Sequence, residues 1–249
     1  MEKWKIYNIF NEEKSMVAGT TTKNLEKNFF YSLAVHTNED LKKIWQNREE
    51  FMKSFPDNFK FVSQFQVHSN RVINIDKYEL NSRWTDLKLD ADGFVTTKKG
   101  VILNILTADC LALLAYDPKN RVVGAAHAGW RGTKDEIAKN LIKSMVNLGA
   151  NIKDIKVALS PSIKACCYEV GQEVAKHFFD YKDALVKTSK DKWHLDISIV
   201  NYKQLLKEGI NEKNIEVSQY CTSCSSDIYF SYRKEGGCSG RFISFIGMV

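Results

Sequence analysis

The stretch VILNILTADCLALLAYDPKNRVVGAAHAGWRGT, Val101 to Thr133, decides how the chain folds. It contains three short apolar runs, Val101–Leu106, Leu111–Tyr116 and Arg121–Ala126. Uninterrupted apolar runs of this length predict strands that are buried on both faces. An Asp-Pro-Lys-Asn turn separates the second run from the third, so we expect these two strands to form an antiparallel pair.

Polar side chains stand where these strands should begin or end. Cys110 precedes the second run and His127 follows the third, so an antiparallel pair would bring the two side chains close together. His68 follows another expected strand, Phe59–Val67. Two imidazoles and one thiolate form a three-ligand set for zinc that leaves a fourth position open. Three unrelated polar residues, or a nucleophilic pair of Cys110 with either histidine, are the alternatives.

Two glycine-rich segments carry arginines that could bind an anion. The first contains Arg131 and leads into an expected helix, whose start is marked by a capping box of Thr133 and Glu136. Backbone N–H groups at such a helix start, together with the arginine, could hold phosphate. Arg233 and Arg241 bracket the second segment and could clamp phosphate or a carboxylate. A flexible loop and an ordinary β-hairpin turn are the alternatives.

The six cysteines are expected to be reduced, because the N-terminus lacks the apolar segment of a secretion signal. For the same reason we expect a cytoplasmic location. Cys221 and Cys224 form a CxxC pair, which with Cys238 and the Cys166–Cys167 pair could bind a structural zinc or act in redox chemistry. Vicinal cysteines seldom serve one tetrahedral metal, so we disfavour a second metal site and predict that these thiols are not bridged.

Composition and charge limit the class of protein. The chain of 249 residues is 44% hydrophobic and has three prolines and no low-complexity linker, so we expect a single domain over residues 1–249. Its net charge of +6 is spread along the sequence, which suits a solvated surface or a field that attracts anionic substrates. We expect no nucleic-acid partner, because no basic stripe with aromatics is visible, and no membrane partner, because no apolar run is long enough.

The remaining segments alternate between expected helices and strands. Helices are expected at Glu39–Phe55, after Thr133, at Tyr168–Phe179 and at Ile197–Glu208, and a final pair of strands at Ile228–Arg233 and Arg241–Gly247. Because hairpins are frequent, a mixed α+β layered domain fits this order better than a strictly parallel sheet.

Six motifs then connect the sequence with a known family. They are QVHS (66–69), ADGFVTT (91–97), TADC (107–110), HAGWRG (127–132), YEVG (168–171) and FSYRKEGGCSGR (230–241). With these motifs the chain resembles the bacterial laccase-domain family, first called multicopper polyphenol oxidases and now regarded as purine nucleoside phosphorylases. The resemblance runs from about Phe29 to Ile246 and implies an α/β/β/α layered sandwich with mixed sheets.

The resemblance implies one zinc per chain, bound by His68, Cys110 and His127, with copper as the less expected metal. It implies phosphorolysis of adenosine, inosine and 5′-methylthioadenosine, and deamination of adenosine, with purine nucleosides and phosphate as the partners. For proton transfer in deamination, Asp109 or Glu169 could serve. The candidates for phosphate binding are Arg131, Thr133, Arg233 and Arg241. The oligomeric state stays open.

Other functions compete with this one. A copper-dependent polyphenol oxidase would need many histidines, and the chain has five. A hydrolase or amidase that uses Cys110 on a cell-wall precursor, and a non-catalytic nucleoside-binding protein, also remain open. The sequence departs from the family pattern at three places: Ser32-Leu33-Ala34 stands where Asn-Leu-Gly is usual, Ala112 where proline is usual, and Ser160 where glycine is usual.

Overall fold

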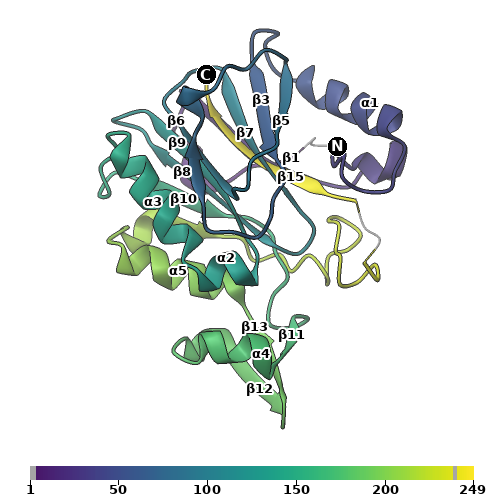
Figure 1. Ribbon diagram of the computed structural model, residues 1–249, viewed down its shortest axis with the longest axis vertical. Helices are drawn as coiled ribbons and strands as arrows, with labels where there is room; N and C mark the ends of the chain where they lie inside the picture. Colours follow the sequence, from purple (N-terminus) through teal and green to yellow (C-terminus); the bar gives the residue numbers. More distant parts are fainter. Residues whose placement is uncertain (1–3, 238–239) are drawn as a thin grey trace.

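Two six-stranded sheets packed face to face form the centre of the protein, and helices cover their outer faces (Figure 1). The structure is a computed structural model and describes residues 4–237 and 240–249. The first sheet has the strand order β1 (Trp4–Lys5), β2 (Met16–Thr21), β15 (Phe242–Met248), β7 (Val101–Thr107), β3 (Lys60–Gln64) and β5 (Trp84–Leu87). The second sheet has the order β14 (Ile215–Val217), β10 (Lys156–Leu159), β8 (Leu111–Asp117), β9 (Val122–Ala128), β6 (Gly93–Thr96) and β4 (Val72–Asn74).

The helices lie on opposite sides of this pair of sheets. Helix α1 (Leu41–Met52) covers the first sheet, and α3 (Ile137–Asn147) and α5 (Ile197–Lys207) cover the second (Figure 1). A third, small sheet of β11 (Glu169–Gly171), β13 (Lys192–Leu195) and β12 (Leu185–Ser189) projects below with α4 (Gln172–Ala175). Both large sheets contain parallel and antiparallel pairs. The expected α/β/β/α sandwich with mixed sheets is therefore confirmed.

The shorter helical elements connect these layers. Helix α2 (Trp130–Lys134) directly precedes α3. Single 3₁₀ turns are found at Asn8–Phe10, Asn28–Tyr31, Ile75–Lys77, Lys176–Phe178, Lys182–Ala184 and Glu212–Asn214. Across residues 4–237 and 240–249, no helix has the length and apolar character that crossing a membrane requires.

Strands β7 and β8 are buried on both faces, as their apolar runs predict. Leu103 of β7 and Leu114 of β8 belong to the core between the sheets. Ile102 turns instead to the core under α1, and Leu113 to the core under α3. Because side chains alternate along a strand, each of these strands must be apolar throughout to fill two cores at once.

The antiparallel pairing of β8 with β9 is also confirmed, and its register places Ala112 opposite His127. Asp117 organises the turn between them, because its carboxylate accepts hydrogen bonds from the backbone of Lys119 and Asn120. It also accepts the backbone N–H of Asn151, which ties the turn to the segment before β10. Burial alone would raise the pKa of Asp117, but the hydrogen bonds from Asn120 and its neighbours outweigh burial and hold the pKa below its usual range.

A buried ion pair anchors α1 to the first sheet. The Arg48 side chain is fully buried and donates two hydrogen bonds to the Asp86 carboxylate, at 2.6 and 3.1 Å. Its guanidinium contacts the rings of Trp45 and Trp84, whose centroids are 5.0 and 4.3 Å away. The Arg48 Nε atom donates to the carbonyl of Leu33 at 2.9 Å. A buried charge with this set of partners holds the helix in one position on the sheet.

The capping box predicted at Thr133 is wrong. Thr133 lies inside α2, where its N–H donates to the carbonyl of Gly129. Glu136 adopts the left-handed conformation, with φ of 60°, and its carboxylate contacts Lys139. The chain therefore kinks between two helices, and the second begins only after Glu136.

Three other local predictions need correction. The segment Tyr168–Phe179 begins as a strand, because Val170 pairs with Trp193 across β11 and β13 and the backbone hydrogen bonds are made there. The expected terminal hairpin is absent: Ile228–Arg233 forms turns, and β15 pairs with β2 and β7 instead. Helix α1 is shorter than expected, since the side chain of Asp40 caps it.

Candidate active site

One end of the sandwich brings His68, Cys110 and His127 together, and we call these residues the His68–Cys110–His127 cluster. One possible metal-binding atom from each residue lies within 4.8 Å of the others. The rings of the two histidines are nearly perpendicular, with centroids 4.8 Å apart. The adjacency of Cys110 and His127 that the hairpin predicts is confirmed.

Each residue of the cluster comes from a different part of the fold. His127 belongs to β9, and Cys110 lies where the chain crosses from β7 in the first sheet to β8 in the second. His68 follows β3 and has a φ of 62°, in the left-handed region that most residues avoid. Asp109, beside Cys110, also has a positive φ, of 89°. Both strained residues are held by hydrogen bonds to neighbouring loops.

Asp92 fixes the geometry of the cluster, a role that no pattern in the sequence indicates. Its fully buried carboxylate accepts the backbone N–H groups of Val67, His68 and Ser69, at 3.2, 3.0 and 2.7 Å. The same carboxylate lies 2.8 Å from Nδ1 of His127. With Nδ1 held by Asp92, the Nε2 atom of His127 is left for Cys110 or a metal. Asp92 is part of the ADGFVTT motif, which in the sequence indicates only the family.

The electrostatics of the cluster favour a thiolate. Burial alone would raise the pKa of Cys110, but the charge of His127 and hydrogen bonds from His127 and His68 outweigh burial and bring the pKa to about 6. Burial would lower the pKa of His127, but the Cys110 charge and the hydrogen bond to Asp92 raise it to about 9. The directions of the two shifts favour a thiolate at Cys110 beside an imidazolium at His127. The thiolate is the form of cysteine that binds metals and acts as a nucleophile.

The glycines of the HAGWRG motif are required by close packing around the cluster. A Cβ atom at Gly129 would lie 2.8 Å from Cδ2 of His68 and 3.2 Å from Sγ of Cys110. A Cβ atom at Gly132 would lie 2.9 Å from the carbonyl oxygen of Ser69. Any larger residue at Gly129 would therefore displace two members of the cluster.

The cluster forms one wall of a cavity of about 560 Å³. Arg131, Arg233 and Arg241 also line this cavity. Their guanidinium groups lie over the rings of Trp130, Tyr168 and Tyr232, at 4.5, 5.4 and 5.7 Å respectively. Cationic groups beside aromatic rings suit a ligand that carries both negative charge and a flat ring.

Asp109 lines the cavity, but its carboxylate already has two partners. It accepts the hydroxyl of Thr222 at 2.6 Å and the backbone N–H of Arg233 at 2.7 Å. The backbone carbonyl of Asp109 accepts the N–H of Ile163 at 2.9 Å. Asp109 therefore ties two cavity loops to the corner that carries Cys110.

Two other predicted site residues do not line the cavity. Thr133 is fully buried, and its hydroxyl accepts a hydrogen bond from Asn201 of α5. The proposed seat for phosphate at a helix start there loses its structural basis, because no helix begins at Thr133. Glu169 lies exposed on β11, with its carboxylate 3.4 Å from Lys192, and only its backbone carbonyl contacts Arg233.

Three further cavity residues were not predicted. The side-chain amide of Gln66 exchanges two hydrogen bonds with the backbone of Leu106, which fixes the QVHS loop against the end of β7. Burial, and then the charges of Arg241 and Arg48, lower the pKa of His36. The hydroxyl of Thr107 is buried and has no hydrogen-bond partner among the described residues. The roles of Gln66 and His36 depend on contacts between distant segments, which the sequence does not show.

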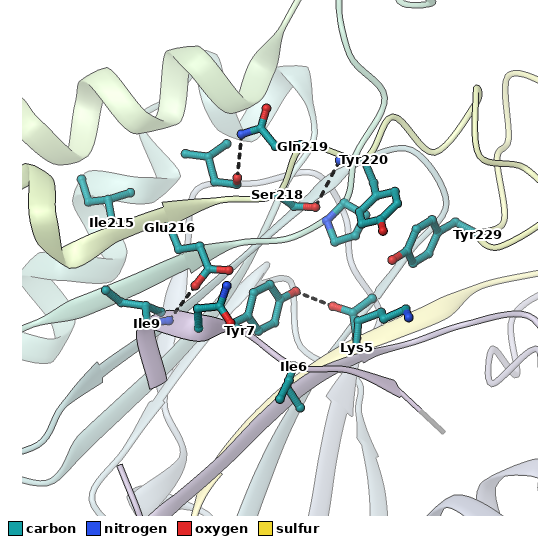
Figure 2. A pocket seen from close by; sticks show the side chains of 14 residues that line it. Lys5, Ile6, Tyr7, Ile9, Ile215, Glu216, Ser218, Gln219, Tyr220 and Tyr229 are labelled. Atoms are coloured by element: carbon teal, nitrogen blue, oxygen red, sulfur yellow. Dashed lines mark hydrogen bonds between the residues drawn. The ribbon is translucent and has the colours of Figure 1, made fainter. Parts of the chain in front are cut away.

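A second pocket, of about 810 Å³, lies at the junction of the first segment of the chain with β14 (Figure 2). The carboxylate of Glu216 there accepts the backbone N–H of Ile9 at 2.6 Å, and Tyr7 is hydrogen-bonded to Thr20. None of the residues that line this pocket was predicted as a site residue. Of these two pockets, only the cavity beside the cluster contains predicted site residues.

The layered sandwich, with the His68–Cys110–His127 cluster at one end of its β8–β9 hairpin, defines a class of protein. Comparison with known protein families identifies this class. The chain belongs to the family described as multi-copper polyphenol oxidoreductase laccase, whose model matches residues 18–249. The purine nucleoside phosphorylase YlmD of Bacillus subtilis (strain 168) is 33% identical over 249 residues, which cover 94% of this chain and 89% of the relative. Adenosine deaminase RL5, from an unknown prokaryotic organism, is 35% identical over 189 residues, covering 71% and 70%.

Solved structures agree with this assignment. YlmD from Geobacillus stearothermophilus superposes with a TM-score of 0.86 at 30% identity, covering 97% of this chain and 94% of that one. The hypothetical protein YfiH of Bacillus licheniformis superposes with a TM-score of 0.88 at 29% identity, covering 96% and 94%. The resemblance carried by the six motifs is confirmed.

Two of the departures from the family pattern, Ala112 and Ser160, are hydrogen-bonded to each other. Where a proline would have no N–H, Ala112 has one, and it is buried inside β8. This N–H donates to the hydroxyl of Ser160 at 2.8 Å, an acceptor that a glycine at that position would not provide. The two substitutions thus avoid an unpaired donor in the core.

Proposed function

We propose that the protein is a zinc-dependent purine nucleoside phosphorylase that cleaves adenosine, inosine and 5′-methylthioadenosine with phosphate and also deaminates adenosine. The observation that carries the proposal is that the His68–Cys110–His127 cluster and three arginines face one cavity with aromatic walls. The printed names of the relatives, a purine nucleoside phosphorylase and an adenosine deaminase, support it.

The donor set of the cluster fits zinc. Two imidazole nitrogens and one thiolate are ligands that zinc prefers, and three protein ligands leave a position for substrate or water. The contact from Asp92 to Nδ1 of His127 is the kind of support that metal-binding histidines have. The other three of the five histidines stand outside the cluster, which disfavours the His-rich sites of multicopper chemistry. Bound zinc would supply a Lewis acid at the wall of the cavity.

Different residues of the cavity would then have different roles in phosphorolysis. Cleavage of a ribosidic bond passes through a state in which the sugar carries positive charge, so the attacking phosphate must be held close to it. Arg131, Arg233 and Arg241 supply the positive charge for that anion. The ring of Tyr168 offers the purine a flat apolar wall, and neutral His36 offers it one N–H donor and one acceptor. For deamination we retain Asp109 as the candidate proton carrier and drop Glu169, which lies outside the cavity.

A panel of nucleosides, incubated with and without phosphate and analysed by chromatography, tests the reaction directly. We expect free base and ribose 1-phosphate only when phosphate is present. Arg131→Ala should raise the KM for phosphate by about ten- to a hundredfold, the size expected when a charge-assisted contact of ~1.5–3 kcal/mol is lost. Zinc content should not change, and deamination, which consumes water, should fall much less. Lys134→Ala, which removes an exposed cation from the same helix, is the matched control.

If Arg131→Ala lowers phosphorolysis and deamination equally, Arg131 does not form the phosphate site, and the assignment moves to Arg233 or Arg241. If no nucleoside is converted at all, the proposed function itself fails.

A cysteine hydrolase remains the second candidate, because one observation favours it. The Asp92 carboxylate contacts Nδ1 of His127, and His127 is in turn hydrogen-bonded to Cys110. This is the arrangement of a Cys-His-Asp triad. A nucleophilic Cys110 would be inactivated by iodoacetamide at the same rate before and after chelation. Protection of Cys110 by bound zinc would argue for the metalloenzyme instead.

A further inference from the structure

We propose that Cys166, Cys167, Cys221 and Cys224 form a second, structural zinc site with four thiolate ligands. Their Sγ atoms all lie within 4.8 Å of one another. Sγ of Cys224 is 3.6 Å from Sγ of Cys166 and 3.4 Å from Sγ of Cys167. From the sequence alone a second site is disfavoured, because the first two cysteines are adjacent and vicinal cysteines seldom serve one tetrahedral metal. The structure nevertheless turns both of their side chains toward the CxxC pair.

These distances are those of a tetrahedral site. With Zn–S bonds of ~2.3 Å, the sulfur atoms of a regular tetrahedron lie about 3.8 Å apart. The two printed separations, and the limit of 4.8 Å on the others, allow such a tetrahedron with small adjustments. A disulfide would require an S–S distance of about 2.05 Å and would leave two of the four thiols unused.

The surroundings of Cys221 suit a metal-bound thiolate. Cys221 is buried, and its sulfur accepts backbone N–H groups from Cys224, Lys164 and Ser223. N–H groups directed at sulfur stabilise its negative charge, as second-shell contacts do around metal ligands. The ammonium group of Lys164, which interacts electrostatically with Cys221 and Cys166, offsets part of the charge that four thiolates bring.

The position of the cluster in the fold explains what the metal would do. The described residues between β14 and β15 form turns and an isolated bridge but no helix and no strand. Irregular segments of this length are uncommon in compact proteins, and a metal that closes a long loop offsets much of its conformational freedom. Cys221 and Cys224 belong to this segment, whereas Cys166 and Cys167 belong to the turn before β11. Zinc would tie the two together.

Both segments build the cavity. Thr222, between the cysteines of the CxxC pair, donates to Asp109, and Arg233 lies farther along the same segment. Tyr168, the residue after Cys167, lines the same cavity, and its ring lies under the Arg233 guanidinium. Because all four ligands would come from the protein, the site would be closed to substrate, which is the mark of structural zinc. The inference does not depend on the nucleoside chemistry proposed above.

The test counts metal in protein purified under reducing conditions without chelator. Atomic mass spectrometry should find about two zinc per chain in the wild type, the sum of one closed and one open site. Cys110→Ser and the double variant Cys221→Ser/Cys224→Ser should each lower the count to about one. Ser223→Ala, in the same turn but without a thiol, should keep both metals. A wild-type count of about one that Cys110→Ser abolishes overturns the proposal.

Cobalt substitution of Cys110→Ser provides a readout that leaves the four cysteines intact, in case the double variant does not fold. The open site of that variant has no thiol, so a strong thiolate-to-cobalt charge-transfer band can come only from the proposed site. Absence of this band in folded, reduced protein overturns the proposal. So does the absence of two alkyl groups after unfolding, metal removal and alkylation without reductant, if the missing groups map to these four cysteines, since this would reveal a disulfide within the cluster.

Discussion

Replacement of Asp92 by asparagine tests how the candidate metal site is positioned. Oδ1 of Asp92 accepts from the backbone N–H of His68 and contacts Nδ1 of His127, and Oδ2 accepts from Val67 and from Ser69 twice. An amide keeps one of these oxygens and puts an NH₂ donor in place of the other. If the NH₂ group replaces Oδ1, it faces the N–H of His68 and Nδ1 of His127; if it replaces Oδ2, it faces the donors of Val67 and Ser69. In either orientation at least two of the hydrogen bonds are lost.

The structure sets the size of the effect. Hydrogen bonds to a charged group contribute ~1.5–3 kcal/mol each, so the loss of two should lower the free energy of unfolding by about 3–6 kcal/mol. Loss of the carboxylate behind a metal-binding histidine typically weakens metal binding by about ten- to a hundredfold. We therefore expect both a less stable fold and a higher zinc dissociation constant at the His68–Cys110–His127 cluster.

Two measurements on each variant separate these effects. Competition with a chelating dye gives the zinc dissociation constant, and urea unfolding of metal-free protein gives the stability. Asp90→Asn, an exposed acid two residues earlier, is the matched control and should change neither. If folded Asp92→Asn binds zinc within about twofold of the wild type, Asp92 does not position the cluster, and the reasoning is refuted.

Three further predictions concern stability, each measured by urea unfolding. Ser160→Gly leaves the buried N–H of Ala112 unpaired and should lower the free energy of unfolding by ~1–3 kcal/mol. Adding Ala112→Pro to the same chain removes this N–H and should restore most of the loss, whereas additive losses would contradict the pairing. Asp86→Ala leaves the Arg48 charge buried and unpaired and should cost ~3–5 kcal/mol, so an unchanged midpoint would show the ion pair to be unimportant. Asp117 has a lowered pKa in the folded state, so its stabilisation is present above about pH 4, the unfolded value, and lost as pH falls through the folded pKa. Asp117→Asn should accordingly show a shallower loss of stability between pH 5 and pH 2, and an identical slope would exclude the effect.

The central hairpin could be predicted because its determinants are local. Apolar runs and one turn specify β8, β9 and their register, and the register alone brings Cys110 to His127. The prediction of a helix start at Thr133 was wrong, because a contact with a distant residue outweighs the local capping pattern. Burial of the Thr133 hydroxyl against Asn201, a residue 68 positions away, outweighs the capping pattern.

Sequence reasoning could not find the groups that depend on packing between distant segments. Asp92 belongs to a motif that indicates the family but not the role of this residue, and the role becomes visible only when β9 brings His127 beside it. The four cysteines had the right chemistry but no predictable proximity, since Cys167 and Cys224 are separated by 57 positions. In both cases residue type indicated chemistry, and the fold decided which residues share a site.

The place of β15 in the middle of the first sheet has a consequence for the order of folding. Its seven buried residues pair with β2 on one side and β7 on the other, and a hydroxyl contact between Thr20 and Ser244 spans 224 positions. On the ribosome, the β8–β9 hairpin can form as soon as its own residues emerge. The first sheet must wait until residue 248 has been made, with the edges of β2 and β7 meanwhile unpaired. Nascent chains of this protein therefore carry two open strand edges for most of their synthesis, and that interval is when they are most exposed to aggregation.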